Sequence, residues 1–492
     1  MLKKASLGAL CAILSLAALS CGSQEPARPE NGSEPVSAPA SGTEAETEVF
    51  SSDVNQLPEP ELPDMDFGGA DYQIYSEWVY SSSSLFPADL FIAAEALNGE
   101  IVNDAVFNRN LKVRERFNTT VKKVDASMSA ASLILAGEPL DLVMSDGVEL
   151  GYAVSSGAYQ NFIDTPYINF DREYWYPQFV EGTHVDGRVF FMPSEICLDP
   201  VINTAIFYFN KRLFSEHDLD NPYDLVDSGT WTVDEYLNLV KTVHGDLNGD
   251  GIMDAEDLYG TLVKTEFRFG AYLQLYFGCG KTFTKADPDE GRIIVTDGEF
   301  CQGLIDKIFD VFKDKTVTKE WDGYEYTEYR RMFAEGHALF CMDEIGAMDN
   351  YREMEDDFGV LPIPKYDVEQ QGYFHRVWPG VGMFAIPASA PDLDKTGIVA
   401  EYMAWISHNT ILPAYYEITI QQKRTRDPRD IDMLEVIRKT LVFDFADIYD
   451  THLTNWFWDS YSYHSYALRV GASWKYLTKR NQKFVKMVRG LD

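Results

Sequence analysis

Basic side chains are scarce in this chain. Its 492 residues include 42 lysines and arginines against 78 aspartates and glutamates, so the formal net charge is −36 at neutral pH. A surface that binds the phosphates of nucleic acid has to be positive. The composition therefore argues against nucleic acid as the main partner, whereas a hydrophobic share of 45% is ample for a folded core.

The common catalytic motifs are also missing. The sequence contains no GxSxG nucleophile elbow, no HExxH zinc motif and no SxxK set with its partners. Gly280-Lys281-Thr282 resembles the end of a phosphate-binding loop, but Leu275 stands where that loop needs its first glycine. We therefore expect a protein that is not an enzyme and that carries no organic cofactor.

Cysteines are few and form no CxxC pair. One lies in the apolar N-terminal segment and another directly follows it. The other four are too widely spaced for a zinc pattern, and their pairing cannot be read from the sequence. We expect these four to be core thiols, free or partly paired: Cys197, Cys279, Cys301 and Cys341.

Residues 1–20 have the features of an export signal. Lys3 and Lys4 precede an apolar run that is too short to span a bilayer comfortably, and no later segment has about eighteen uninterrupted apolar residues. The segment Ala18-Leu19-Ser20-Cys21 resembles the lipobox of bacterial lipoproteins, although Ala18 replaces the usual leucine. This resemblance implies lipidation of Cys21 and an extracytoplasmic chain anchored to the cell membrane. The alternative is a plain cleaved secretory peptide.

A low-complexity segment follows the signal. Gly22 to Asp66 holds seven prolines and eleven acidic residues, with Arg28 as its only base. Such a composition cannot bury enough apolar surface to offset the entropy lost on ordering. We predict a disordered, acidic, proline-rich tether over residues 21–66.

From Phe67 onward, strand and helix patterns alternate. Apolar runs predict strands at 71–75, 140–144, 205–209, 338–342 and 358–361. Residues at helical spacing predict helices at 101–117, 232–243 and around 398–406. Thr232 and Glu235 form a capping box at the start of one of them. The alternation predicts an α/β architecture.

Several ordered motifs resemble one family. Residues 207–214 (FYFNKRLF) and 229–236 (GTWTVDEY) resemble the "YNKxLF … TWxE" signature of extracellular solute-binding proteins that serve ABC importers. Further segments agree in the same order and extend the resemblance to the large sugar-type lipoproteins of the family: 136–143, 333–338, 359–364 and 415–434.

The resemblance implies a two-lobed periplasmic-binding-protein-like α/β fold with a hinge and a ligand cleft between the lobes. We expect lobe 1 at 67–203 plus 379–416 and lobe 2 at 204–378 plus 417–492. The implied function is that a monomer captures a solute, which we expect to be an oligosaccharide, and delivers it to the transmembrane subunits of an ABC permease. A surface glycoside hydrolase and a calcium-dependent adhesion module remain as alternatives.

Ligand contacts in cleft proteins usually lie on loops that follow strands. Trp78, Asp146 and Glu344 each follow a predicted strand, and Trp378 lies in the loop 376–380. Sugars offer flat C–H faces and many hydroxyls. We therefore predict Trp78 and Trp378 as aromatic platforms and Asp146 and Glu344 as hydroxyl acceptors, the alternative for either tryptophan being a place in the core. Nine further aromatics between 449 and 476 indicate either a stacking wall or, preferably, terminal helices packed on lobe 2.

An acidic loop resembles a calcium-binding loop. It has oxygen donors at loop positions 1, 3, 5, 7, 9 and 12 and a glycine at position 6, where the chain turns sharply. Its predicted ligands are Asp246, Asn248, Asp250, the backbone carbonyl of Ile252, Asp254 and Asp257. Position 12 is aspartate instead of the usual glutamate, so bidentate coordination of the ion by this shorter side chain is less assured. We predict one structural Ca²⁺, the alternative being an acidic turn without metal.

Overall fold

The structure is a computed structural model that describes residues 56–77, 79–83, 85–266, 269–421, 427–449 and 451–490. These residues belong to one compact unit, Phe50–Asp492. The export signal, Cys21, residues 21–55 of the predicted tether and Trp78 lie outside the described residues. Among the helices that are described, none combines the length and the apolar character needed to cross a bilayer.

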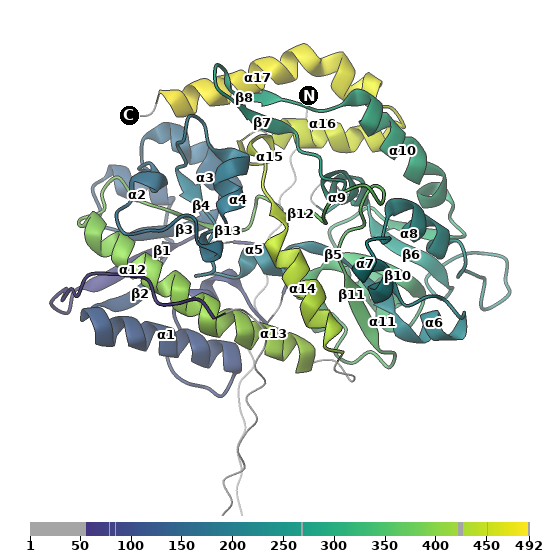
Figure 1. The fold of residues 1–492 in the computed structure, drawn as a ribbon, viewed down its shortest axis with the longest axis horizontal. Coiled ribbons are helices and arrows are strands. Elements are labelled where there is room, and N and C mark those ends of the chain that lie inside the picture. The colour runs from purple at the N-terminus through teal and green to yellow at the C-terminus, as the bar shows by residue number, and fades with distance from the viewer. Residues whose placement is uncertain are drawn as a thin grey trace, which may run out of the picture. The chain divides into compact units, whose positions relative to one another are not determined.

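The first large sheet has the strand order β2-β1-β3-β13-β4. Its strands are β1 (Asp71–Ser76), β2 (Thr120–Asp125), β3 (Leu142–Asp146), β4 (Phe191–Met192) and β13 (Gly382–Ala385). β1 runs parallel to β2 and β3, whereas β13 is antiparallel to β3 and β4. One strand from late in the chain is thus inserted into a sheet built from the early part (Figure 1).

The second large sheet has the order β11-β5-β10-β6-β9. Its strands are β5 (Ala205–Asn210), β6 (Tyr259–Lys264), β9 (Thr318–Trp321), β10 (Ala338–Glu344) and β11 (Phe358–Leu361). β6, β9 and β10 run parallel to one another, and β5 is antiparallel to both of its neighbours. Every residue of β5, β6, β10 and β11 is buried, which explains why these strands appear in the sequence as continuous apolar runs.

Two small sheets complete the strands. β7 (Thr284–Asp287) and β8 (Gly291–Ile294) form a hairpin, and β12 (His375–Arg376) pairs with β14 (Leu441–Val442).

Helices surround the sheets. The longer ones are α1 (Ile101–Phe117), α8 (Val233–Val240), α9 (Ala271–Gly278), α10 (Gly298–Lys313), α11 (Thr327–Ala334), α12 (Leu393–Ile406), α13 (Leu412–Gln421), α14 (Arg429–Lys439), α16 (Thr451–Ser462) and α17 (Ala472–Arg489). The shorter ones are α2 (Ala130–Leu135), α3 (Gly147–Ala153), α4 (Pro177–Thr183), α5 (Asp199–Ile202), α6 (Lys211–Glu216), α7 (Pro222–Asp227) and α15 (Phe445–Tyr449). Short segments of 3₁₀- or π-helix are η1 (Ala88–Phe91), η2 (Val154–Ser156), η3 (Phe162–Asp164), η4 (Glu173–Trp175), η5 (Ile345–Asn350), η6 (Ser407–Ile411) and η7 (Ala467–Gly471).

The local predictions agree closely with these elements. All five predicted strands and all three predicted helices are present, with ends shifted by a few residues. Thr232 caps α8, because its Oγ1 accepts a hydrogen bond from the Glu235 N–H at 3.3 Å. The neighbouring Trp231 is fully buried and donates its indole N–H to the Pro362 carbonyl at 2.8 Å. The four cysteines within the described residues are buried and free.

Residues 56–66, the described end of the predicted tether, lie against the body. The Leu57 carbonyl accepts hydrogen bonds from the indole N–H of Trp405 at 2.8 Å and from the amide of Asn409 at 3.0 Å. The Leu57 N–H donates in turn to Asn409 Oδ1 at 2.9 Å. Packing against the body therefore begins before Phe67.

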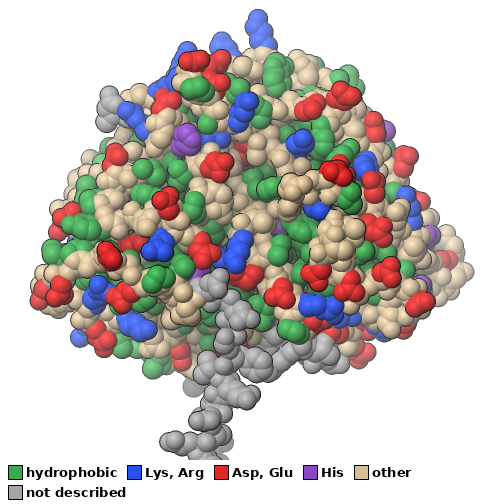
Figure 2. All heavy atoms as spheres, in the orientation of Figure 1, with side chains coloured by type: hydrophobic (Ala, Val, Ile, Leu, Met, Phe, Trp, Pro, Cys, Tyr) green, Lys and Arg blue, Asp and Glu red, His purple; other side chains and the backbone are tan. Residues whose placement is uncertain are grey.

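The aromatic residues near the C-terminus pack on a neighbouring helix. Tyr272 of α9 stacks on Phe457 of α16, with ring centroids 4.9 Å apart and planes only 3° from parallel. The ring of Tyr461, also on α16, lies 5.9 Å from the ring of Tyr272. The rings of Phe457 and Tyr461 are both buried. This arrangement agrees with the preferred prediction of terminal helices packed through their rings for α16, whereas Trp474 and Tyr476 of α17 are 38% and 47% exposed. Figure 2 shows acidic side chains scattered over the visible face of the molecule.

Candidate ligand-binding site

The carboxyl end of β3 carries Asp146, which caps a helix. Its Oδ1 accepts hydrogen bonds from the N–H groups of Val148 at 2.7 Å and Glu149 at 3.2 Å, the first turn of α3. Directly after the neighbouring strand β1, Glu77 accepts from the Ala130 N–H at 2.6 Å and from the Ser145 hydroxyl. The carboxylates at this edge of the first sheet therefore hold local backbone and hydroxyl groups.

The carboxyl end of β10 carries Glu344, which is fully buried in an ionic cluster. Its two carboxylate oxygens lie 2.8 and 2.9 Å from Lys264 Nζ, and Oε2 lies 3.3 Å from Arg330 Nη2. The preceding residue, Asp343, accepts from Lys264 Nζ at 2.5 Å and from Arg330 Nε at 2.9 Å. Two cations thus balance two carboxylates, and the cluster is formally neutral.

The two carboxyl groups of this cluster have opposite pKa shifts. Burial, together with the ionised Asp343 beside it, raises the pKa of Glu344 to about 7, although Lys264 favours the ionised form. Burial also opposes ionisation of Asp343, but Arg330 and Lys264 outweigh it and lower the pKa of Asp343. Asp343 is therefore firmly ionised, whereas Glu344 titrates near neutral pH.

Aromatic rings lie next to this cluster. Lys264 Nζ is 3.9 Å from the ring centroid of Tyr326 and 5.3 Å from that of Phe269. Phe269 packs against Trp378 at 5.6 Å, and Trp378 meets the edge of Tyr80 at 5.5 Å and 86°. The four rings form an aromatic group, defined as Tyr80, Phe269, Tyr326 and Trp378, beside the ionic cluster.

Trp378 is held in place by its own loop. A Cβ at Gly380 would lie 2.3 Å from atoms of the Trp378 ring, so only glycine leaves room for the indole. The tryptophan side chain is half-buried. Its position next to Tyr80 brings the loop that follows β12 close to the segment that follows β1.

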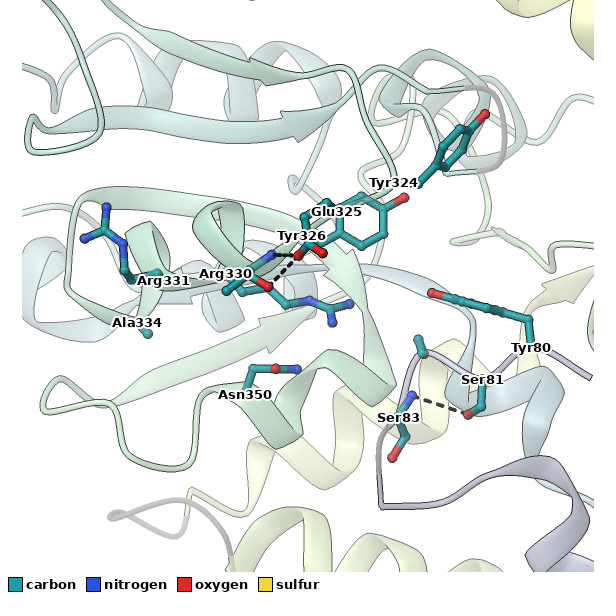
Figure 3. Close-up of a pocket in the computed structure, with 12 residues that line it drawn as sticks. Tyr80, Ser81, Ser83, Tyr324, Glu325, Tyr326, Arg330, Arg331, Ala334 and Asn350 are labelled. Atoms are coloured by element: carbon teal, nitrogen blue, oxygen red, sulfur yellow. Dashed lines mark hydrogen bonds between the residues drawn. The ribbon is translucent and has the colours of Figure 1, made fainter. Parts of the chain in front are cut away.

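A cavity of ≈550 Å³ lies beside the aromatic group (Figure 3). Its lining includes Tyr80, Ser81 and Ser83, from the segment after β1, and Tyr324, Tyr326 and Arg330, from the start of α11 and the loop before it. In Figure 3 the Tyr80 hydroxyl and the Arg330 guanidinium point toward one another across the cavity. Segments next to both large sheets therefore contribute to one cavity of a size suited to a small ligand.

None of the predicted ligand residues that the structure describes lines this cavity, but two of them contact residues that do. Asp146, Glu344 and Trp378 are absent from its lining, but Trp378 contacts Tyr80 and Glu344 contacts Arg330, and both of these partners line it. Trp78 lies outside the described residues. The ligand roles of all four remain predictions.

Sequence reasoning missed the residues that do line the cavity. Tyr80 lies only two positions beyond Trp78, and Tyr324 and Tyr326 flank Glu325 in a short segment between β9 and α11. Closely spaced tyrosines in a loop that follows a strand were a usable signal. Arg330 gave no such signal, because an arginine on a helix ordinarily faces solvent.

The acidic loop 246–257 makes hydrogen bonds mainly within itself. Asp246 accepts from the N–H groups of Gly249 at 2.6 Å and of Gly251 at 2.7 Å, and Gly251 has a φ of +80°. Asp257 accepts from the N–H groups of Leu247 and Asp254 at 2.9 Å each, which lowers the pKa of Asp257. Hard oxygen donors suit Ca²⁺. However, the described residues contain no group of three or more His, Cys, Asp or Glu side chains that could hold a metal ion.

Comparisons with known proteins give a result at the level of fold. No family model matches the chain, and no curated protein does. Among solved structures, a cyclo/maltodextrin-binding protein complexed with maltotetraose has a TM-score of 0.52 and 14% identity over 85% of this chain and 97% of the other. The GacH receptor of Streptomyces glaucescens, studied without ligand and with acarbose, has a TM-score of 0.51 and 13% identity over 86% and 100%.

The chain has the fold of sugar-binding receptors of this kind. The predicted two-lobed α/β fold class is thereby confirmed. A third similar structure, with a TM-score of 0.52 and 14% identity over 85% and 99%, is that of a de novo designed esterase improved by directed evolution. At such identities the likeness concerns the fold alone, and function has to be argued from the site.

Proposed function

We propose that this chain is the solute-binding component of an ABC importer and that it captures an oligosaccharide. The observation that carries the proposal is the ≈550 Å³ cavity, which segments next to both large sheets line, in a chain with the fold of sugar receptors. Two proteins of that fold have been solved with maltotetraose and with acarbose. Closure of the two halves around the solute would stabilise a form that the permease recognises.

The chemistry of the cavity suits a neutral sugar. The rings of Tyr80, Tyr324 and Tyr326 offer faces for sugar C–H groups, and Ser81 and Ser83 belong to a run of hydroxyl-bearing residues on the same wall. The positive charge of Arg330 is already balanced by Asp343 and Glu344. A strongly anionic solute would therefore gain little from this arginine.

Solute binding can be tested with a panel of oligosaccharides. We expect at least one sugar to raise the melting temperature of the chain, because a ligand that binds only the folded state stabilises it. Tyr80→Ala and Tyr326→Ala should each lower the affinity for that sugar roughly tenfold or more, since each removes a ring from the cavity wall. Tyr152→Ala is the matched control, because Tyr152 is 49% exposed and lies elsewhere. Absence of any shift with sugars would contradict the proposal.

Membrane anchoring is a second part of the proposal. Lipidation of Cys21 would hold the receptor at the extracytoplasmic face of the cell membrane, close to the permease. Cys21→Ser should release the protein from the membrane fraction into the medium. Retention of that variant on membranes would instead support a different mode of attachment.

Calcium binding by the loop 246–257 is a third part. The donor types, the glycine at position 6 and the hydrogen bond from the N–H of that glycine, Gly251, to Asp246 support a structural Ca²⁺. The carboxylates would have to gather around the ion. We expect Ca²⁺ to raise the melting temperature and the double variant Asp246→Ala/Asp250→Ala to abolish that rise. A wild-type chain that does not respond to Ca²⁺ would exclude the site. An adhesion module would need several such loops, whereas the sequence has one.

One observation bears on the hydrolase alternative. Asp343 and Glu344 form a pair of carboxyl groups whose pKa values are pushed apart, as in many acid–base pairs. Both side chains are fully buried and are held by Lys264 and Arg330, so neither can reach a glycosidic oxygen. We therefore favour a receptor without catalytic activity. Release of shorter products from candidate glycans would reject this part of the proposal.

A further inference from the structure

The C-terminal helix α17 has the opposite charge from the rest of the chain. Its 18 residues include six basic side chains and no acidic one, in a chain with a net charge of −36. Figure 2 shows basic side chains projecting from the upper edge of the molecule, where Figure 1 places α17. Such segregation is not needed for folding, because the helix is held by its apolar side.

The basic residues are ordered along one face of the helix. Four exposed lysines lie at spacings of four, four and three, which keeps them within one narrow stripe. We call this the lysine stripe: Lys475, Lys479, Lys483 and Lys486. The buried residues of α17 lie on the opposite face: Leu477, Asn481, Val485 and Val488.

The lysine stripe is not used inside the molecule. Within the described part of the chain, none of its four ammonium groups has an ion-pair partner. Arg489, by contrast, is ion-paired with Asp186 at 2.5 Å, and Gln482 donates to Glu290 of the hairpin β7–β8 at 3.0 Å. Two acidic groups near α17, Asp186 and Glu290, are thus engaged by other residues of the helix, and the stripe faces outward.

Exposed apolar and aromatic side chains lie at the N-terminal end of the stripe. Leu468 is 68% exposed, and Tyr476, whose ring stacks on that of Trp456, is 47% exposed. Tyrosine and tryptophan are enriched where proteins meet the interface of a lipid bilayer, and lysines there interact with anionic headgroups. A row of flexible ammonium groups suits a diffuse anionic surface, whereas a specific acidic protein site is better matched by arginine.

We propose that α17 is a contact surface for an anionic lipid bilayer. The lysine stripe meets the headgroups, and Leu468 and Tyr476 contact the bilayer beside it. Because the chain as a whole has a strongly negative net charge, the rest of its surface is repelled by such a bilayer, and this contact orients the receptor on the membrane. The inference goes beyond solute capture and depends on neither the solute nor a lipid at Cys21.

The test is sedimentation of the full chain with vesicles, with Cys21→Ser in every arm so that no lipid anchor contributes. Pure phosphatidylcholine vesicles are compared with vesicles that contain about one third phosphatidylglycerol. We expect at least about tenfold tighter binding to the anionic vesicles, lost at about 0.5 M salt because screening weakens contacts between exposed charges.

Two matched variants assign the effect. Changing Lys475, Lys479, Lys483 and Lys486 to glutamine should abolish the preference for anionic vesicles without lowering the melting temperature, because these side chains are exposed. The control changes four exposed lysines outside α17 to glutamine and should keep the preference: Lys112, Lys122, Lys241 and Lys315.

Three results would overturn the proposal. In the first, the Cys21→Ser chain with its native lysine stripe binds both vesicle types equally, so that there is no preference for anionic lipid. An equal loss in the two quadruple variants would show that total charge matters, not the lysine stripe. If the stripe variant lost binding to detergent-solubilised permease but kept its binding to vesicles, the partner would be a protein.

Discussion

Two carboxylates that occupy the same position in their sheets have different surroundings. Asp146 is the last residue of β3 in the first large sheet, and Glu344 is the last residue of β10 in the second. Asp146 is half-buried and accepts hydrogen bonds from two amides of the helix that it caps. Glu344 is fully buried and is held by Lys264 and Arg330, which come from a neighbouring strand and a neighbouring helix.

The difference shows what a strand end alone can specify. A carboxylate after a strand finds helix amides whenever a helix starts there, so the surroundings of Asp146 are local. Glu344 also precedes a helical turn, but its partners lie 80 and 14 residues away in the sequence. The topology places both residues at the carboxyl end of a strand. The neighbouring elements alone decided that Asp146 became a helix cap and that Glu344 became part of an ionic cluster.

The largest expected effect comes from removing the cation at the centre of the cluster. Lys264→Met should lower the free energy of unfolding by about 3–5 kcal/mol, because it leaves two buried carboxylates with Arg330 alone. Denaturant unfolding measures this loss. The control is Lys313→Met, whose ion pair with Glu320 is 39% and 25% exposed, so that less than about 1 kcal/mol is expected. Equal losses in the two variants would contradict the assigned difference in burial.

A smaller effect should appear as a pH dependence. Because the pKa of Glu344 is raised from 4.5 to about 7, the folded chain keeps a proton that the unfolded chain has lost between these pH values. The stabilising contribution of this group is therefore present at low pH and is lost as pH rises toward 7, by at most about 1.4 kcal/mol per pH unit.

Glu344→Gln removes this titration without changing the shape of the side chain. Unfolding free energies of wild type and variant should therefore diverge between pH 5 and about 7, with the wild type losing stability relative to the variant as pH rises. A difference that does not change with pH would mean that Glu344 is ionised throughout this range.

The smallest effect is expected at Asp146. Asp146→Ala should cost about 1 kcal/mol through loss of the α3 cap, and Asp146→Asn should cost only a few tenths because its amide oxygen can still accept from the helix. Thermal or denaturant unfolding distinguishes the two variants. A loss of sugar affinity in Asp146→Asn at unchanged stability would instead support the predicted role as a hydroxyl acceptor.

Much of the fold could be predicted because its signals are local. Buried strands such as β5 and β10 appear as apolar runs, and the cap at Thr232 depends on residues three positions apart. The cavity could not be predicted in the same way. Its walls include Tyr80 and Tyr326, which are 246 positions apart and meet only because segments beside the two sheets converge.

The sequence by itself determined an α/β chain with an acidic composition, placed its main strands and helices, and indicated the family resemblance through motifs in order. Periodicity and capping are encoded over a few residues, so they can be read without the fold. The tertiary structure alone decided that Lys264 pairs with Glu344, that Trp378 packs against Tyr80 and that four lysines of α17 face outward with no ion-pair partner among the described residues. Contacts between distant segments depend on which elements pack together, and that is a property of the whole fold.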